Sequence, residues 1–169
     1  MEPKLSEKQD IWYIEAFCNS NYSGDKDTQI SVSGYIIYLM GSPVAWRSQS
    51  QKSVTLSSTE AEYISITEVI TEIMFIKQVL EFLGLEIEYP IIVRVDNVGA
   101  IYLANNMTTR KRTKHMDIHY HYVREFIEDG ILKIIFVRSE ENDSDIYTKN
   151  VSGKLFEKHT DKYMKDIEE

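Results

Sequence analysis

The chain has few of the sequence features that would by themselves identify a disulfide-rich, membrane, secreted or low-complexity protein. It has a single cysteine, Cys18, so no internal disulfide can form, and we expect a reducing, intracellular setting in the cytoplasm or nucleus. No stretch approaches the roughly 18 consecutive apolar residues of a membrane helix, and the first residues lack the apolar centre of a secretion signal. Only three prolines and seven glycines are present, and no low-complexity linker interrupts the chain.

Positive charge is also scarce. The chain has 19 Lys and Arg against 27 Asp and Glu, a net charge of −8, which argues mildly against a free-standing nucleic-acid binder because phosphate contacts need basic side chains. The basic residues are not evenly spread, and a local basic patch can bind a polyanion even when the net charge of the chain is negative. One dense cluster is our candidate for phosphate contact, with a solvated loop as the alternative: Arg110, Lys111, Arg112 and Lys114.

The composition is otherwise that of a folded soluble domain. Hydrophobic residues make up 43% and charged residues 27% of the 169 positions, which is ordinary for a globular protein. A chain of this length can bury a substantial core and is most simply one domain. We expect residues 1–10 to be a disordered leader and residues 11–166 to form a single domain.

Hydrophobic periodicity predicts a mixed α/β order. Tight turns between the first three strands indicate an antiparallel meander, and a capping-box pattern at residues 57–60 starts a long helix that Gly84 ends. In the second half, strand–helix–strand connections favour parallel pairing. Strands are expected at 11–19, 30–40, 44–50, 91–95 and 131–137, and helices at 57–83, 97–106, 115–129, 142–149 and 153–165. We therefore expect a mixed sheet with helices on its faces.

Three carboxylates are candidate functional residues because of their positions in the predicted elements. Glu62 shares the apolar face of the long helix, where an isolated charge is costly, although a side chain that extends to solvent explains it equally well. Asp96 follows an apolar strand, and functional groups gather at the carboxyl ends of such strands; capping the next helix is the alternative. Asp145 lies in the first turn of a predicted helix, where any acid is favoured.

Carboxylates from three separate elements could converge on hard cations. Mg²⁺ prefers oxygen ligands, and two ions roughly 3.5–4 Å apart can activate a water and stabilise the leaving oxygen of a phosphodiester. Spacing in the sequence does not by itself establish that these side chains meet.

Five motifs, in order, resemble the ribonuclease H domain of copia-type retrotransposon Pol polyproteins. Residues 57–63 read Ser-Ser-Thr-Glu-Ala-Glu-Tyr and resemble that family's SSTEAEY signature. The other four are similar to SGY…WRS, DN..AI, RTKHIDI and DILTK, and they lie at residues 33–48, 96–101, 112–118 and 145–149. The similarity covers about residues 12–165.

The resemblance implies a ribonuclease H-like fold, a five-stranded mixed sheet flanked by helices, and an activity. The family cuts the RNA strand of RNA–DNA hybrids with two Mg²⁺ or Mn²⁺ ions. By motif position, Glu62, Asp96 and Asp145 match three of its four catalytic, metal-binding acids. The implied partners are an RNA–DNA hybrid and the reverse transcriptase domain of a parent polyprotein.

The fourth acid is missing. The family's first motif is usually Y-S-D-S-D-W/Y-A-G-D, and here residues 17–25 read Phe-Cys-Asn-Ser-Asn-Tyr-Ser-Gly-Asp, which places Asn19 where the metal-bridging aspartate belongs. An amide offers one neutral oxygen and two donors instead of two anionic oxygens. We therefore predict that catalysis is severely impaired. The alternative is a non-catalytic module, a domesticated or relic fragment that binds nucleic acid or protein.

Polar residues near these motifs are candidates for contacting the hybrid. Ser57, Ser58 and Asn97 match family positions that touch the backbone or 2′-hydroxyls, with helix capping and turn formation as equal alternatives. Trp46 could stack on a sugar or base, but we expect it to pack in the core.

Overall fold

The computed structural model describes residues 11–22, 30–52, 54–106 and 114–162. The expected leader, residues 1–10, lies outside this range, as do Arg110, Lys111, Arg112 and the side chain of Lys114. The predictions made for these residues remain predictions.

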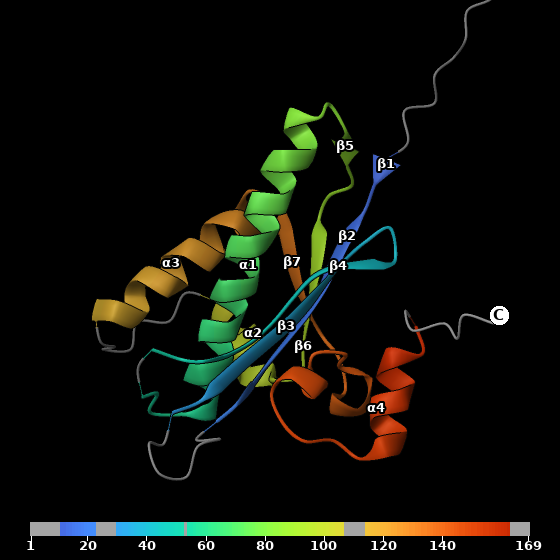
Figure 1. The fold of residues 1–169 in the computed structure, drawn as a ribbon. Coiled ribbons are helices and arrows are strands. Elements are labelled where there is room, and N and C mark those ends of the chain that lie inside the picture. The colour runs from blue at the N-terminus through green and yellow to red at the C-terminus, as the bar shows by residue number, and fades with distance from the viewer. Residues whose placement is uncertain (1–10, 23–29, 53, 107–113, 163–169) are drawn as a thin grey trace, which may run out of the picture.

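A five-stranded mixed sheet forms the centre of the molecule, in the order β4-β3-β2-β6-β7 (Figure 1). Its strands are β2 (Ile14–Asn21), β3 (Val32–Leu39), β4 (Ser42–Ser50), β6 (Ile91–Val95) and β7 (Leu132–Phe136). The meander β2-β3-β4 is antiparallel, while β6 pairs in parallel with both β2 and β7. The predicted α/β mixed sheet is confirmed. The first residues of the strand expected at 11–19 form a separate short strand, β1 (Ile11–Trp12), which pairs in parallel with β5 (Glu86–Ile87). The sequence did not predict β5 or this pairing.

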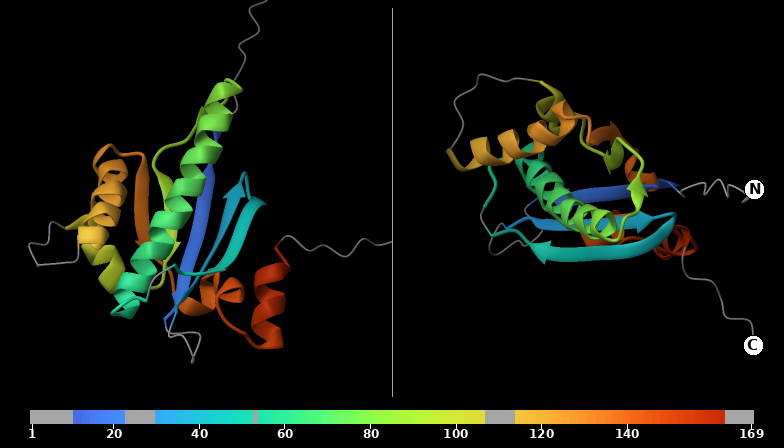
Figure 2. Two further views of the ribbon diagram at one scale, coloured as in Figure 1. Left: turned by 60° about the vertical axis from the view of Figure 1, so that its left-hand side comes forward. Right: turned by 90° about the horizontal axis from the view of Figure 1, so that it is seen from above.

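Four α-helices and two 3₁₀ turns surround the sheet. The helices are α1 (Ser58–Phe82), α2 (Val98–Asn105), α3 (Lys114–Glu128) and α4 (Gly153–Thr160), and the 3₁₀ turns are η1 (Ser139–Glu141) and η2 (Asp145–Tyr147). Helices α3 and α4 lie on opposite sides of the sheet (Figure 2). No helix within the described residues is both long and apolar enough to cross a membrane.

Helix α1 begins and ends where the sequence predicts. The Ser57 hydroxyl accepts the backbone N–H of Glu60 at 3.2 Å, and the Glu60 carboxylate accepts that of Leu56 at 2.6 Å. After the helix, Gly84 has φ +77°, a left-handed conformation that glycine adopts without steric cost. The capping box and the glycine stop therefore fix the bounds of the helix that carries Glu62.

The main core lies between α1 and the sheet. The apolar stripe of α1 packs on β2 and β3 through fully buried side chains such as Tyr63, Ile66 and Ile70. The opposite face of the sheet carries a smaller cluster of Phe17, Ile36, Tyr38 and Val137, with Tyr147 of η2 packed against it. The segment that holds Asp145 is thus attached to the sheet by apolar contacts.

The expectation that Trp46 packs in the core is wrong. Its side chain is 61% exposed. It stands opposite Ile36 on β4, which is an edge strand, so it has a neighbouring strand on one side only.

Candidate active site

The ends of β2 and β6 place two of the candidate residues at one edge of the sheet. These strands are parallel neighbours, so their carboxyl ends meet at the same edge. Asn19 lies near the end of β2, and Asp96 directly follows β6. Helix α1 brings Glu62, and turn η2 brings Asp145, to the same edge.

Asn19 and Asp145 are in direct contact. Asn19 is 3% exposed and Asp145 2% exposed, and the Asn19 amide Nδ2 donates a short hydrogen bond to Asp145 Oδ1. The other oxygen, Asp145 Oδ2, lies 2.8 Å from the Lys149 ammonium nitrogen. Both oxygens of this carboxylate therefore accept N–H groups of the protein itself.

Glu62 is held at one oxygen only. Its side chain is buried, and Oε1 accepts the Ser20 backbone N–H at 2.7 Å and the Ser20 hydroxyl at 3.0 Å. Oε2 is buried and has no hydrogen-bond partner in the described part of the chain. The expectation that this side chain shares the buried face is met, and the alternative in which it extends to solvent is not.

Burial and like charge set the protonation of these acids. The pKa of Glu62 is raised to about 8: burial is the largest cause, the charges of Asp96 and Asp145 act in the same direction, and the hydrogen bonds from Ser20 oppose the rise. Burial also raises the pKa of Asp145, while Lys149 lowers it. The charges of Asp96 and Asp145 both act on Glu62, and the charge of Asp96 acts on Asp145, so the three acids share one electrostatic environment.

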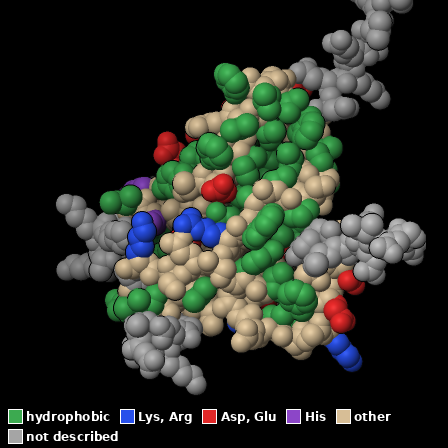
Figure 3. Space-filling model, in the orientation of Figure 1, with side chains coloured by type: hydrophobic (Ala, Val, Ile, Leu, Met, Phe, Trp, Pro, Cys, Tyr) green, Lys and Arg blue, Asp and Glu red, His purple; other side chains and the backbone are tan. Residues whose placement is uncertain are grey.

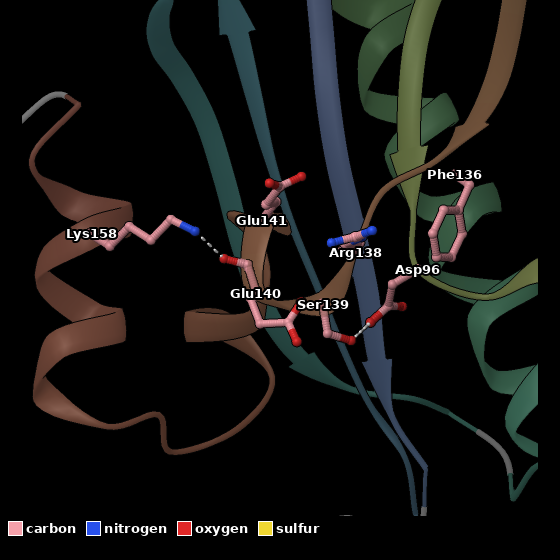
Figure 4. A pocket seen from close by; sticks show the side chains of 7 residues that line it. All are labelled: Asp96, Phe136, Arg138, Ser139, Glu140, Glu141 and Lys158. Carbon is pink, nitrogen blue, oxygen red and sulfur yellow. Dashed lines mark hydrogen bonds between the residues drawn. The ribbon is translucent and has the colours of Figure 1, made fainter.

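Asp96 lies at the mouth of a cleft (Figure 4). It is half-buried, and its Oδ2 accepts the hydroxyl of Ser139 in η1 at 2.5 Å. The cleft has a volume of about 600 Å³ and extends from Asp96 and Phe136 to Lys158 of α4. Asp96 does not cap α2, because the side chain of Asn97 does so, accepting the Ala100 N–H at 3.0 Å.

The side chains in this arrangement do not fit a pair of divalent cations. Such ions need oxygen lone pairs directed at them, but both Asp145 oxygens accept N–H groups and Asn19 turns its NH₂ towards Asp145. Among the described residues, no group of three or more His, Cys, Asp or Glu side chains could hold a metal ion. We therefore derive no catalytic step through a bound metal.

Solved ribonuclease H structures share this fold. The compost-derived LC11-RNase H1 superimposes with a TM-score of 0.60 at 14% identity, covering 80% of this chain and 92% of that one. The same protein in complex with an RNA/DNA hybrid gives a TM-score of 0.56 at 13% identity, covering 80% and 93%. The N-terminal RNase H domain of Rv2228c from Mycobacterium tuberculosis gives 0.54 at 12% identity, covering 88% and 96%. At these identities the likeness establishes the fold alone.

Sequence relatives are retrotransposon polyproteins. The chain is 37% identical over 149 residues to the retrovirus-related Pol polyprotein from transposon RE1 of Arabidopsis thaliana, and 39% identical over 144 residues to that from transposon TNT 1-94 of Nicotiana tabacum. These matches cover 88% and 85% of this chain. This chain has a ribonuclease H-like fold and is similar, along most of its length, to a segment of retrotransposon Pol polyproteins. It spans 10% and 11% of those two relatives, and no family model matches it.

Two of the expected nucleic-acid contacts of this ribonuclease H-like domain have structural roles. Ser57 caps α1 and Asn97 caps α2 through their side-chain oxygens. Ser58, the first residue of α1, is exposed. The capping alternative is therefore met at two of the three positions, and hybrid contact by any of them stays a prediction.

Sequence reasoning missed three polar groups that shape the ribonuclease H-like site. Ser20 donates twice to Glu62, Ser139 donates to Asp96, and Lys149 pairs with Asp145. Lys149 could have been found, because residues four apart on a helical turn face one another. The contacts of Ser20 and Ser139 span 42 and 43 residues of sequence, so no local pattern signals them.

Proposed function

We propose that this domain binds RNA–DNA hybrid and that its inherited activity, metal-dependent cleavage of the RNA strand, is severely impaired by Asn19. The observation that carries the proposal is the state of Asp145, whose two oxygens accept the Asn19 amide and the Lys149 ammonium. In a metal-dependent site such oxygens would face cations. Here each of the two oxygens already accepts an N–H group of the protein, which leaves fewer lone pairs for a cation.

The chemistry of the amide supports the impairment. A carboxylate at position 19 would offer two anionic oxygens, whereas the Asn19 NH₂ end cannot ligate a cation and repels it. Burial also raises the pKa of Glu62 to about 8, so near neutral pH this carboxyl offers Mg²⁺ or Mn²⁺ less negative charge than an exposed glutamate would. Removing one transition-state donor from an enzyme costs about 10²–10³ in rate, and we expect the loss of a bridging ligand to cost at least as much.

The homology and the fold support hybrid binding. A ribonuclease H of the same fold has been solved with an RNA/DNA hybrid, and this chain is similar to a segment of Pol polyproteins along most of its length. Binding does not require the metal pair, because phosphate contacts by basic and polar side chains supply most of the affinity for nucleic acid. We assign those contacts to Ser57, Ser58, Asn97, Arg110, Lys111, Arg112 and Lys114.

Cleavage of a labelled hybrid by the unmodified chain and by Asn19→Asp, with Mg²⁺ and with Mn²⁺, tests the proposal. We expect no cleavage above background for the unmodified chain and measurable cleavage after the reversion. Asn21→Asp is the matched control, because it adds the same charge two residues further along β2 and should leave the chain inactive. Robust cleavage by the unmodified chain would refute the impairment.

An apolar surface on α1 favours a protein partner as a second function. Phe75, Val79 and Phe82 recur at helical spacing on the C-terminal half of α1 and are 61%, 42% and 90% exposed, and hydrophobic side chains gather over this part of the molecule in Figure 3. Contiguous exposed apolar surface is typical of protein interfaces. We propose the reverse transcriptase domain of a parent polyprotein as the partner. In a pull-down with that domain, Val79→Asp with Phe82→Asp should abolish association while hybrid binding stays unchanged.

A further inference from the structure

The cleft beside Asp96 combines an open aromatic ring with a cation. Phe136 is the last residue of β7, is paired in register with Val95, and is 52% exposed. Its ring therefore lies next to Asp96, as Figure 4 shows. Two residues on, Arg138 lines the same cleft and is exposed. None of the lining side chains drawn in Figure 4 hydrogen-bonds its guanidinium.

What distinguishes Phe136 from the other exposed hydrophobic residues is its position at the end of a parallel strand, beside Asp96. The carboxyl ends of parallel strands are where ligands bind in sheets of this kind. A ring that is 52% exposed is only partly packed against the protein there, so its open face can take a flat ligand. Aromatic rings beside cationic side chains are the usual platform for single-stranded nucleic acid, because every base has a face to stack and every nucleotide has a phosphate.

We propose that this cleft binds an unpaired nucleotide of the strand that leaves the hybrid, with its base on Phe136 and its phosphate at Arg138. This inference rests on the proposed hybrid binding and adds a subsite to it. The nucleotide must be unpaired, because bases inside a duplex are already stacked on both faces and only splayed or single-stranded bases reach aromatic side chains. The volume of about 600 Å³ is within the range of about 300–1,000 Å³ that is usual for small-ligand pockets.

The charges of the cleft orient the ligand. Glu140 lies beside Ser139, on the side away from Phe136 (Figure 4), and repels a phosphate there. The Lys158 ammonium lies at the end of the cleft away from Phe136 and donates a hydrogen bond to the Glu140 backbone oxygen at 2.7 Å. Arg138 is the cation that remains for the ligand, so the phosphate lies at its guanidinium and away from the Asp96 carboxylate beside Phe136, which repels it as Glu140 does.

The test measures the affinity of the whole chain for a blunt RNA–DNA hybrid and for the same hybrid with a short single-stranded extension on each end in turn. We expect one extension to tighten binding and Phe136→Ala to lower the affinity for that ligand roughly tenfold, with the blunt hybrid unchanged. Arg138→Ala should lower the slope of log affinity against log salt by roughly 0.7 for the extended ligand, the value for one phosphate contact on a single strand. Arg138→Lys should keep most of that slope.

Two controls match the variants away from the cleft. Phe82→Ala removes an aromatic ring that is 90% exposed on α1, and Lys133→Ala removes an exposed cation on β7. Neither should change the advantage of the extended ligand. A 2-aminopurine base in the extension should also lose fluorescence on binding to the unmodified chain and retain it with Phe136→Ala.

The outcomes separate this inference from the function on which it rests. If the unmodified chain binds neither ligand at low salt, hybrid binding itself is refuted. If it binds both ligands equally, or if Phe136→Ala keeps the advantage of the extension, hybrid binding stands and the subsite is overturned. A similar loss with Phe82→Ala would also overturn it, because the effect would then not belong to the cleft.

Discussion

Asn19 should make the site stable without a metal, and reverting it should make stability depend on one. In Asn19→Asp, the hydrogen bond from the buried amide to the charged Asp145 oxygen is lost. Hydrogen bonds to charged groups contribute about 1.5–3 kcal/mol. A second carboxylate then faces Asp145, and two like charges about 4 Å apart repel by up to about 4 kcal/mol at an effective dielectric constant of 20. Because one of the two can take up a proton, we expect a net loss of about 2–4 kcal/mol in the free energy of unfolding.

Urea unfolding at pH 7.5 measures this loss, with EDTA and then with excess Mg²⁺. A cation that binds the folded reverted site at a hundred times its dissociation constant restores about 2.7 kcal/mol, whereas the unmodified chain should gain little. Asn19→Ala removes the amide without adding charge and separates the lost hydrogen bond from the repulsion. The reasoning is refuted if Asn19→Asp is as stable as the unmodified chain in EDTA, or if Mg²⁺ stabilises both chains equally.

Three further predictions concern the surroundings of the site. The pKa of Glu62 is raised from 4.5 to about 8 in the folded chain, so between these pH values the folded chain holds a proton that the unfolded chain has released. The free energy of unfolding should therefore fall as pH rises from about 4.5 to 8, by at most about 1.4 kcal/mol per pH unit. Chemical denaturation at several pH values measures this slope, and Glu62→Gln should flatten it. Gly34→Ala should destabilise by about 1–3 kcal/mol, because the added Cβ would lie 2.7 Å from Thr148 Cγ2 and 2.9 Å from Tyr147 Cβ; an unchanged melting temperature would contradict this close packing. Ser57→Ala should cost about 1 kcal/mol through loss of the α1 cap, measured by thermal unfolding, while Ser58→Ala should cost little.

The elements were predictable where local physics decides them. The capping box at Ser57 and the glycine stop at Gly84 gave the bounds of α1, since both depend on residues within one helical turn. Parallel pairing in the second half of the chain followed from its strand–helix–strand connections, whereas the position of β6 beside β2 was not predicted. The short pair β1–β5 has two residues on each strand, which is too few to show a period.

The proximity of the candidate acids was predictable, but their contacts were not. Motif similarity placed Glu62, Asp96 and Asp145 together, yet the hydrogen bond from Ser139 to Asp96 depends on how η1 packs and is invisible in the sequence. Trp46 was misassigned because size and hydrophobicity indicate burial only where a second layer covers the residue. On the edge strand β4 the side chain is 61% exposed.

Counting bound Mn²⁺ by electron paramagnetic resonance, in the unmodified chain and in Asn19→Asp, tests the central claim most directly. The claim is that an amide and an ammonium hold Asp145 where cations would otherwise bind. We predict no tightly bound Mn²⁺ in the unmodified chain and two ions in the reverted chain. Two tightly bound ions in the unmodified chain would contradict it.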